Sequence, residues 1–182
     1  MGCMVLNTFL LQNPHLKISG VIFGSPFFEL SEAFGFDAGK KLAVQLARPL
    51  LETFVVSGAP KLHKIFQNMA YKRRQLMQRK CMPLIDVNGI CSFLEGIDNL
   101  QKNAEHFVYP FTMMQGDLDD VVSNPGALIW YKNTKGVKPE NKSKVMFKGA
   151  THELHTEPQP LKANVLKHAM AFMVKRMGLP RE

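Results

Sequence analysis

Short apolar segments alternate with helix-like segments along the chain, and this alternation restricts the possible folds more than any other feature. The apolar segments are residues 18–24, 108–116 and 143–147, each bounded by charged or turn-forming residues. Helical patterns cover residues 124–135, which follow a Ser-Asn-Pro start signal, and residues 161–177. The order strand, helix, strand, helix predicts a parallel sheet with right-handed crossovers and helices on its faces. We therefore expect an α/β fold.

The connection between the first two strands is longer than a single crossover helix requires. It holds more than 80 residues, although about a dozen can suffice for such a crossover. Residues 39–56 and 60–80 are predicted helices of an insertion, and residues 90–106 are the predicted crossover helix. The insertion has the size of a lid over an active site, but a helical subdomain without that role fits the same pattern. We place a first core segment at residues 1–28, a helical cap insertion at residues 29–88 and the remaining core at residues 89–182.

The composition is that of one soluble globular domain. The chain has 182 residues, 46% of them hydrophobic and 21% charged, which excludes disordered and fibrous classes. No apolar run approaches the roughly 20 residues of a membrane-spanning helix. The net charge is +8, and residues 71–80 contribute five positive charges without an acid. Such a run usually forms a solvated helix face, and because no nucleic-acid-binding motif accompanies it, we expect no nucleic-acid partner.

The cysteines indicate the redox compartment. Cys3, Cys81 and Cys91 are an odd number without metal-ligand spacing. This pattern argues against disulfides and a zinc site, and favours an intracellular, reducing compartment, either cytoplasmic or peripheral to membranes. No other group of residues predicts a metal site.

The amino-terminal segment predicts a helix that begins without a capping residue. Residues 2–11 are apolar on nearly every face, as in a buried helix, and no cap precedes them. We expect from this that sequence upstream of residue 1 is missing.

An acid and a histidine follow two neighbouring strands. Asp119 comes shortly after the second strand and His152 shortly after the third. Because the carboxyl ends of parallel strands meet at one edge of a sheet, the two side chains can meet. Asp119 would then hold one tautomer of the His152 imidazole, and His152 would deprotonate a nucleophile. Asp and His are also ordinary loop residues, and we expect the nearby His155 to be a surface or supporting residue.

Four motifs occur in an order that points to a family. Residues 1–3 read MGC, residues 18–26 read ISGVIFGSP, residues 115–119 read QGDLD and residues 149–152 read GATH. They resemble, in turn, the end of the nucleophile elbow, the next strand, the acid loop and the histidine loop of α/β hydrolases of the monoacylglycerol lipase, lysophospholipase and serine aminopeptidase type. The resemblance implies the carboxyl-terminal half of an α/β-hydrolase fold, with parallel strands, flanking helices and a helical cap insertion.

The resemblance also implies roles for single residues. Asp119 would be the acid of a catalytic triad and His152 its base. The nucleophilic serine would stand immediately before Met1, so we expect the chain as written to lack it. The backbone nitrogen of Met1 would be one oxyanion-hole donor if the chain extends upstream. No cofactor is implied.

No residue of the chain is expected to replace that serine. Cys3 falls on a glycine position of the elbow and is expected to be a small packing residue. Ser25 resembles the structural Ser-Pro turn after the strand, and Ser123 is a predicted helix start.

Two functions remain open at this stage. The first is part of a serine hydrolase that cleaves a carboxylic ester, with an acylglycerol or lysophospholipid as the leading substrate class and peptides as a further possibility. The second is a non-catalytic, hydrolase-like structural or interaction subunit of a larger assembly. For the hydrolase, the sequence is either incomplete or one piece of a split enzyme. We expect a protein partner to supply the missing strands unless upstream sequence does so. The apolar residues of the cap would line an acyl tunnel, touch a membrane surface or simply pack on the sheet; they are Leu42, Val44, Leu46, Leu50, Leu51, Phe54 and Val55.

Overall fold

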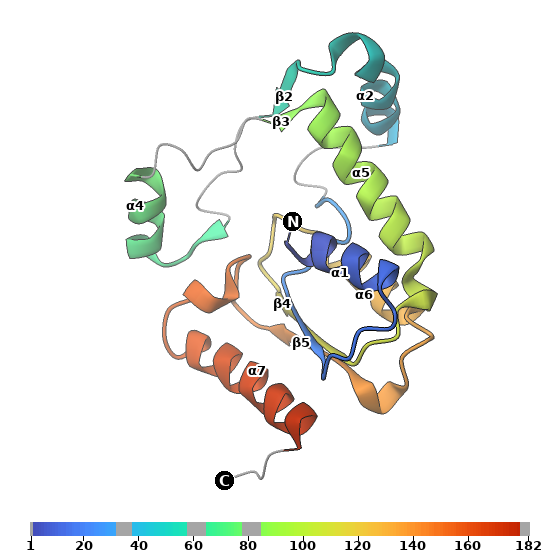
Figure 1. Ribbon diagram of the computed structural model, residues 1–182. Helices are drawn as coiled ribbons and strands as arrows, with labels where there is room; N and C mark the ends of the chain where they lie inside the picture. The colour runs from blue at the N-terminus through green and yellow to red at the C-terminus, as the bar shows by residue number, and fades with distance from the viewer. Residues whose placement is uncertain (1, 32–37, 58–64, 78–84, 179–182) are drawn as a thin grey trace.

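Three parallel strands form the central sheet of the computed structural model (Figure 1). The structure describes residues 2–31, 38–57, 65–77 and 85–178. The strand order is β1-β4-β5, with Val21 opposite Phe111 and Phe111 opposite Lys142. This arrangement confirms the parallel α/β sheet expected from the sequence. The strands are β1 (Val21–Gly24), β4 (Phe111–Gly116) and β5 (Lys142–Phe147).

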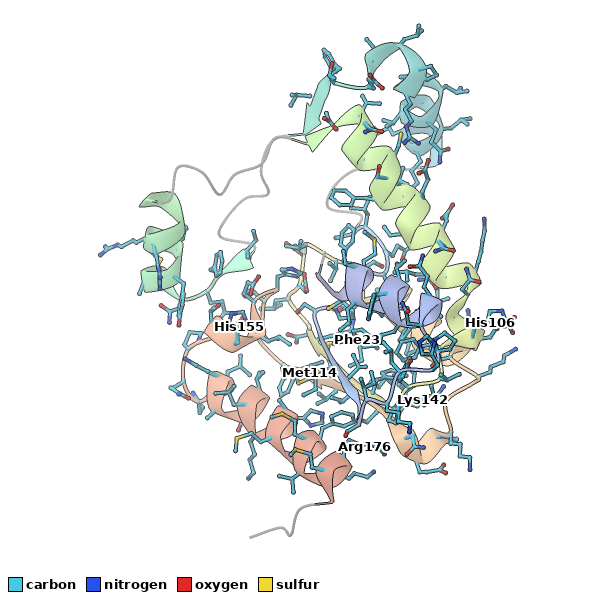
Figure 2. The ribbon with its side chains drawn as sticks, viewed as in Figure 1. Phe23, His106, Met114, Lys142, His155 and Arg176 are labelled. Atoms are coloured by element: carbon cyan, nitrogen blue, oxygen red, sulfur yellow. The ribbon has the colours of Figure 1, made fainter. Side chains whose placement is uncertain are left out.

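Helices cover both faces of this sheet. Phe23 and Met113 point to the face that packs on α1, α5 and α6, whereas Met114 points to the face that packs on α7 through Val165. The labelled side chains of Phe23 and Met114 lie in the interior between α1 and α7 (Figure 2). Strands with apolar neighbours on both faces explain the nearly continuous apolar segments in the sequence. The helices are α1 (Gly2–Gln12), α5 (Val87–Lys102), α6 (Asn124–Asn133) and α7 (Leu161–Met177).

Aromatic side chains fill the core between the sheet and α6. The ring of Phe23 lies 5.5 Å from that of Phe28 and 5.6 Å from that of Trp130, both in edge-to-face geometry. Phe107 and Phe111 pack on the same indole, and all five side chains are essentially buried. Burial of such large rings contributes most of the apolar area that stabilises a core.

In the described parts of the insertion, residues 38–57, 65–77 and 85–88, the chain forms two helices and a two-stranded antiparallel ladder. In Figure 1 the ladder and α2 lie at the end of α5 that is remote from the sheet, and α4 lies apart from them. The expectation of a helix as far as residue 56 is wrong at its end, because Val55 pairs with Asp86 in the ladder. β-Branched residues such as Val55 and Val56 favour extended backbone. The elements are α2 (Ala38–Leu51), β2 (Val55–Ser57), α4 (Met69–Met77) and β3 (Ile85–Asp86).

The expectation of one helix over residues 60–80 is wrong at residues 66–68, which are not helical, whereas residues 60–64 and 78–80 lie outside the described residues. The other helices differ from prediction mainly at their ends. The crossover helix α5 begins at Val87, because the side chain of Asp86 caps it by accepting from the Gly89 N–H group at 2.7 Å. A 3₁₀ turn, η2 (Ala104–His106), follows α5, and two more short turns are η3 (Pro139–Asn141) and η4 (Leu154–Thr156). None of the described helices is long and apolar enough to cross a membrane. The domain boundaries after residues 28 and 88 stay predictions.

Candidate functional site

Asp119 and His152 lie side by side beyond the carboxyl ends of β4 and β5. The Nδ1 atom of His152 is 2.9 Å from the Oδ2 atom of Asp119. The side chain of Asp119 has no exposed surface, and that of His152 is 18% exposed. A buried carboxylate and a partly accessible imidazole are the arrangement in which a histidine base reaches a substrate while its acid stays dry.

The turn after β4 holds the Asp119 carboxylate in place. Its Oδ1 atom accepts hydrogen bonds from the backbone N–H groups of Val121 at 2.9 Å and Val122 at 3.1 Å. The other oxygen is thereby directed to His152. An ionised carboxylate only accepts hydrogen bonds, so the proton of the contact belongs to Nδ1 of the imidazole. The Nε2 atom of a neutral His152 is then the lone-pair nitrogen that can take a proton.

Gly116 allows the acid loop and the histidine loop to touch. A Cβ atom on Gly116 would collide with the carbonyl oxygens of Ala150 and Thr151. The Leu118 N–H group donates to the Ala150 carbonyl at 3.0 Å, and the Gly149 N–H group donates to the Asp117 carboxylate at 2.6 Å. The absence of a side chain at Gly116 therefore sets the distance between the two loops.

Two buried groups hold the backbone around His152. Ser25, at the end of β1, donates its hydroxyl to the His152 carbonyl at 2.6 Å. The Glu157 side chain accepts from the N–H group of Thr151 at 2.5 Å and from its hydroxyl at 2.6 Å. Glu157 is only 2% exposed. Glu157 was not among the predicted site residues, and Ser25 was expected only as part of a turn. No sequence motif distinguishes either residue from an ordinary structural residue.

The cap insertion reaches the histidine loop at residues 65–67. The carbonyl oxygen of Ile65 accepts from the Thr151 hydroxyl at 3.0 Å and from the Glu153 N–H group at 3.3 Å. The Gln67 side chain donates to the Gly149 carbonyl at 2.5 Å. The loop that carries the histidine is thus held by both the sheet and the cap.

The other candidate residues do not belong to the Asp119–His152 pair. The Cys3 thiol donates to the Gly24 carbonyl at 3.4 Å, and burial raises its pKa above the usual value, which disfavours the thiolate. This fits the expected packing role. The Nδ1 atom of His155 lies 3.4 Å from a carboxylate oxygen of Glu153, and the His155 side chain is mostly exposed. Met1, the expected oxyanion donor, lies outside the described residues. Ser123 caps α6, as predicted, by accepting from the Gly126 N–H group.

Within the described ranges, no group of three or more His, Cys, Asp or Glu side chains has the arrangement of a metal site.

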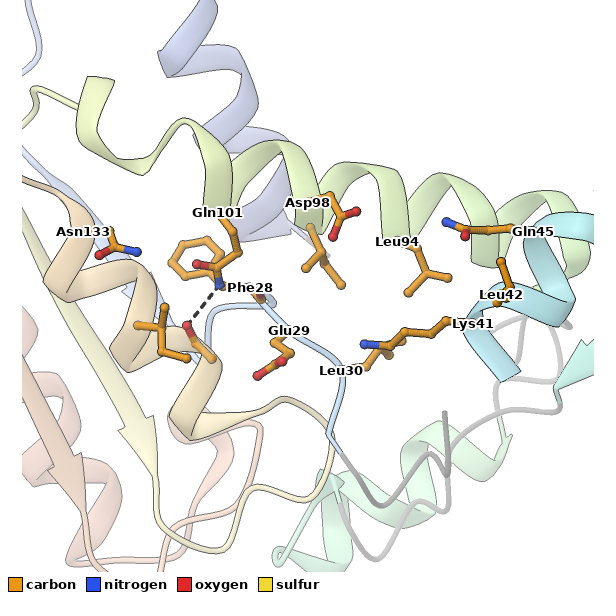
Figure 3. Close-up of a pocket in the computed structure, with 13 residues that line it drawn as sticks. Phe28, Glu29, Leu30, Lys41, Leu42, Gln45, Leu94, Asp98, Gln101 and Asn133 are labelled. Carbon is orange, nitrogen blue, oxygen red and sulfur yellow. Dashed lines mark hydrogen bonds between the residues drawn. The ribbon is translucent and has the colours of Figure 1, made fainter. Parts of the chain in front are cut away.

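A separate pocket of about 460 Å³ opens between α2, α5 and α6 (Figure 3). Gln101 donates to the Gly126 carbonyl at 3.1 Å on its wall, and Leu42 of the cap contributes apolar surface. Neither Asp119 nor His152 lines this pocket. It is therefore distinct from the candidate catalytic pair.

Comparison with known proteins identifies a family and a fold. The family described as "Serine aminopeptidase, S33" matches residues 1–159. Among curated protein sequences, none matches the chain significantly. Solved structures of similar fold include a monoacylglycerol lipase from Paleococcus ferrophilus (TM-score 0.75, 17% identity) and a soluble variant of monoglyceride lipase from Saccharomyces cerevisiae in complex with a substrate analog (TM-score 0.75, 17% identity). A thermostable carboxyl esterase from Bacillus coagulans in complex with glycerol is also similar (TM-score 0.63, 11% identity).

The similarity covers nearly all of this chain but only part of each solved structure. It extends over 96% of the chain and 65% of the P. ferrophilus lipase, 96% and 62% for the S. cerevisiae enzyme, and 95% and 61% for the B. coagulans esterase. The chain thus spans less than two thirds of the length of the structures that it matches.

Proposed function

The chain belongs to the serine aminopeptidase S33 family of α/β hydrolases, and on that premise we propose that it is the acid- and base-bearing part of a serine hydrolase that cleaves carboxylic esters of lipids. The observation that carries this proposal is the 2.9 Å contact between His152 Nδ1 and Asp119 Oδ2. A purely structural role would not require a buried carboxylate aimed at a partly exposed imidazole.

The reaction follows from the hydrogen bonding of this pair. The Nε2 atom of His152 takes the proton of a serine hydroxyl as the serine oxygen attacks the ester carbonyl carbon. The imidazolium, which Asp119 stabilises, gives that proton to the departing alcohol oxygen and leaves an acyl-serine. A water molecule gives a proton to the same nitrogen as its oxygen attacks the acyl carbon. The imidazolium then returns that proton to the serine oxygen as the bond between serine and acyl carbon breaks, which releases the fatty acid and the free serine.

The nucleophilic serine is proposed to come from polypeptide outside residues 1–182. Ser25 contacts the histidine, but its hydroxyl donates to the His152 carbonyl oxygen and not to the ring. Cys3 donates to a strand carbonyl and its thiolate is disfavoured by burial. Neither is placed as a nucleophile.

The free edge of β1 supports a nucleophile that comes from other polypeptide. We propose that the protein partner is a complementary hydrolase segment. Among the described residues, β1 pairs only with β4, so its other edge is open to a further parallel strand. Helix α1 packs on one face of the sheet through its buried residues and carries exposed apolar residues as well. The exposed residues are Val5, Leu6 and Phe9.

A second exposed apolar stripe lies on α7, across the sheet from α1. Lys175 of α7 reaches the Glu140 carbonyl beside β5, whereas Arg176 reaches the Ser19 carbonyl just before β1. The stripe lies on the side of the helix opposite Lys175 and therefore toward β1. An added strand that carries one helix on each of its faces could pair with the open edge of β1, and its two helices could cover α1 and α7. The stripe consists of Leu166, Met170, Met173 and Met177.

The cap supports a lipid substrate. Leu46 and Leu50 lie one helical turn apart on α2, and Leu50 is 86% exposed. Phe54 continues the exposed apolar surface after the helix. We propose that this surface contacts a membrane or lipid aggregate from which an acylglycerol or lysophospholipid is taken. The printed descriptions of two similar structures, a monoacylglycerol lipase and a monoglyceride lipase, agree with that substrate class.

The alternative is a non-catalytic, hydrolase-like subunit. The exposed apolar faces of α1 and α7 favour this alternative because they fit contacts with a protein partner. The two proposals differ in what they demand of His152. A scaffold tolerates its replacement, whereas an enzyme does not.

A fluorophosphonate probe for activated serines tests the proposed function. The 182-residue chain alone should not react, whereas a polypeptide extended upstream through the serine elbow should be labelled at that serine. His152→Ala should abolish the labelling in the extended protein, and His155→Ala should leave it unchanged as the matched control. Labelling of the isolated chain at Ser25 would contradict the assignment, and an extended protein that folds without reacting would favour the scaffold.

A further inference from the structure

Ser25 stands out because it combines an unfavourable backbone conformation with a buried contact to the candidate base. Its φ is +43°, in the left-handed region that is uncommon for residues other than glycine, asparagine and aspartate. Its side chain is nearly buried and donates to the His152 carbonyl oxygen at 2.6 Å, across 127 residues of sequence. Strained conformations of this kind persist where the surrounding structure requires them.

We propose that Ser25 is a positioning residue that fixes the His152 peptide, and through it the imidazole, relative to the sheet. This inference rests on the proposed function of His152 as a base. It assigns to Ser25 a role beyond that of a turn residue after β1.

The position of Ser25 is itself determined by the sheet. Its N–H group donates to the Met114 carbonyl at 2.8 Å, which extends the ladder between β1 and β4 by one residue. The left-handed φ then turns the chain away from the strand and leaves the hydroxyl on the histidine loop. Through Ser25, strand β1 thus fixes the distance of the His152 carbonyl from the carboxyl end of the sheet.

The acid does not depend on this contact. Asp119 is held by the N–H groups of Val121 and Val122 in its own turn. By contrast, the His152 carbonyl accepts, besides the bond from Ser25, a hydrogen bond from the Leu154 N–H group of its own loop at 3.2 Å. Removal of the Ser25 hydroxyl should therefore move the histidine relative to a carboxylate that stays in place.

The first test measures the imidazole directly and needs no activity. Ring-¹⁵N-labelled histidine in the 182-residue chain reports which ring nitrogen carries the proton, and the His152 signals are assigned by their loss in His152→Gln. Spectra of sedimented protein by magic-angle spinning keep the measurement possible if the chain self-associates. The wild-type chain should show His152 protonated at Nδ1. Ser25→Ala should convert this signal into a mixture of tautomers.

Ser25→Gly separates positioning from backbone geometry. Glycine adopts positive φ without strain, so a residue needed only for the turn would be replaced by it without effect on His152. Positioning by the hydroxyl predicts that Ser25→Gly disturbs the tautomer as Ser25→Ala does. Ser143→Ala is the matched control, because it removes a hydroxyl that donates to Thr112 at 2.9 Å; it should leave His152 unchanged.

The outcomes distinguish this inference from the proposed function. Any of three results would overturn the positioning role. Nδ1 protonation of His152 could be unchanged in both Ser25 variants, it could be disturbed in Ser25→Ala but normal in Ser25→Gly, or both variants could unfold. In the extended protein, Ser25→Gly should lower kcat by about 10²-fold with little change in KM, the scale expected for a displaced catalytic group. If the extended wild-type protein is inactive while the tautomer still responds to Ser25, the hydrolase proposal fails and the positioning role stands.

Discussion

His152 Nδ1 lies 2.9 Å from Asp119 Oδ2, although 33 residues separate the two side chains. The contact joins the loops after β4 and β5, and it exists because these strands are parallel neighbours in register. One carboxylate oxygen is occupied by backbone N–H groups and the other by the imidazole. The pair is thus arranged to hold a single tautomer of the His152 imidazole.

Asp119→Asn should abolish this control while leaving the fold intact. An amide can offer its N–H to Nδ1 and favour the wrong tautomer, and loss of the acid in a serine triad lowers kcat on the order of 10⁴-fold. Steady-state hydrolysis of a short-chain ester by the extended protein would measure this. The exposed Asp120 offers the control, because Asp120→Asn should be mild.

Asp117 is not a neutral control for that experiment. Its carboxylate accepts from the Gly149 N–H group at 2.6 Å and so connects the acid loop to the histidine loop. We expect Asp117→Asn to have an intermediate effect. If it were more damaging than Asp119→Asn, the assignment of the acid would be wrong.

Gly116→Ala should destabilise the protein. The added methyl group would collide with backbone carbonyls of Ala150 and Thr151, and backbone cannot move aside as a flexible side chain can. We expect a loss of about 1–3 kcal/mol in the free energy of unfolding, the usual range for overpacking. Urea denaturation measures it, with Gly24→Ala as the control because a Cβ atom there meets nothing within 4 Å. Equal effects of the two substitutions would refute the steric explanation.

The exposed apolar face of α1 should make the isolated chain self-associate. Val5, Leu6 and Phe9 on α1 are exposed, and among the described residues one edge of β1 has no paired strand. Exposed apolar faces and open strand edges both associate with other chains. Phe9→Glu should raise the monomer fraction in size-exclusion chromatography, because a buried charge opposes association. Ile129→Glu, on an exposed apolar residue of α6, should have less effect. A monomeric wild-type chain with strong hydrogen-exchange protection at residues 21–24 would contradict this prediction.

Cys3 should react slowly with iodoacetamide near neutral pH. Burial raises the pKa of its thiol, so less of the reactive thiolate is present than in an exposed cysteine, and the rate should rise as the pH increases. Mass spectrometry of the Cys3 peptide gives the rate, and the same peptide in the urea-unfolded chain is the reference. Faster alkylation in the folded protein would reveal an activated thiol instead of a packing residue.

The sequence determined the order of strands and helices in the core and pointed to the two side chains, Asp119 and His152, that the structure brings together. The apolar segments 108–116 and 143–147 predicted the strands that the structure places at residues 111–116 and 142–147. Helix α7 begins and ends at the predicted residues 161 and 177. Asp119 and His152 could be chosen because the ends of parallel strands share one edge of a sheet. These properties depend on local pattern and on general rules of topology.

Only the tertiary structure decided which atoms meet. The Val55–Asp86 pairing in the cap, the contact of Gly116 with the histidine loop, and the hydrogen bond from Ser25 to His152 each join segments far apart in the sequence. Such contacts depend on strand register, loop path and side-chain packing to within fractions of an ångström. A local pattern does not encode them, because the same Ser-Pro turn or glycine fits many loop arrangements until the surrounding elements pack.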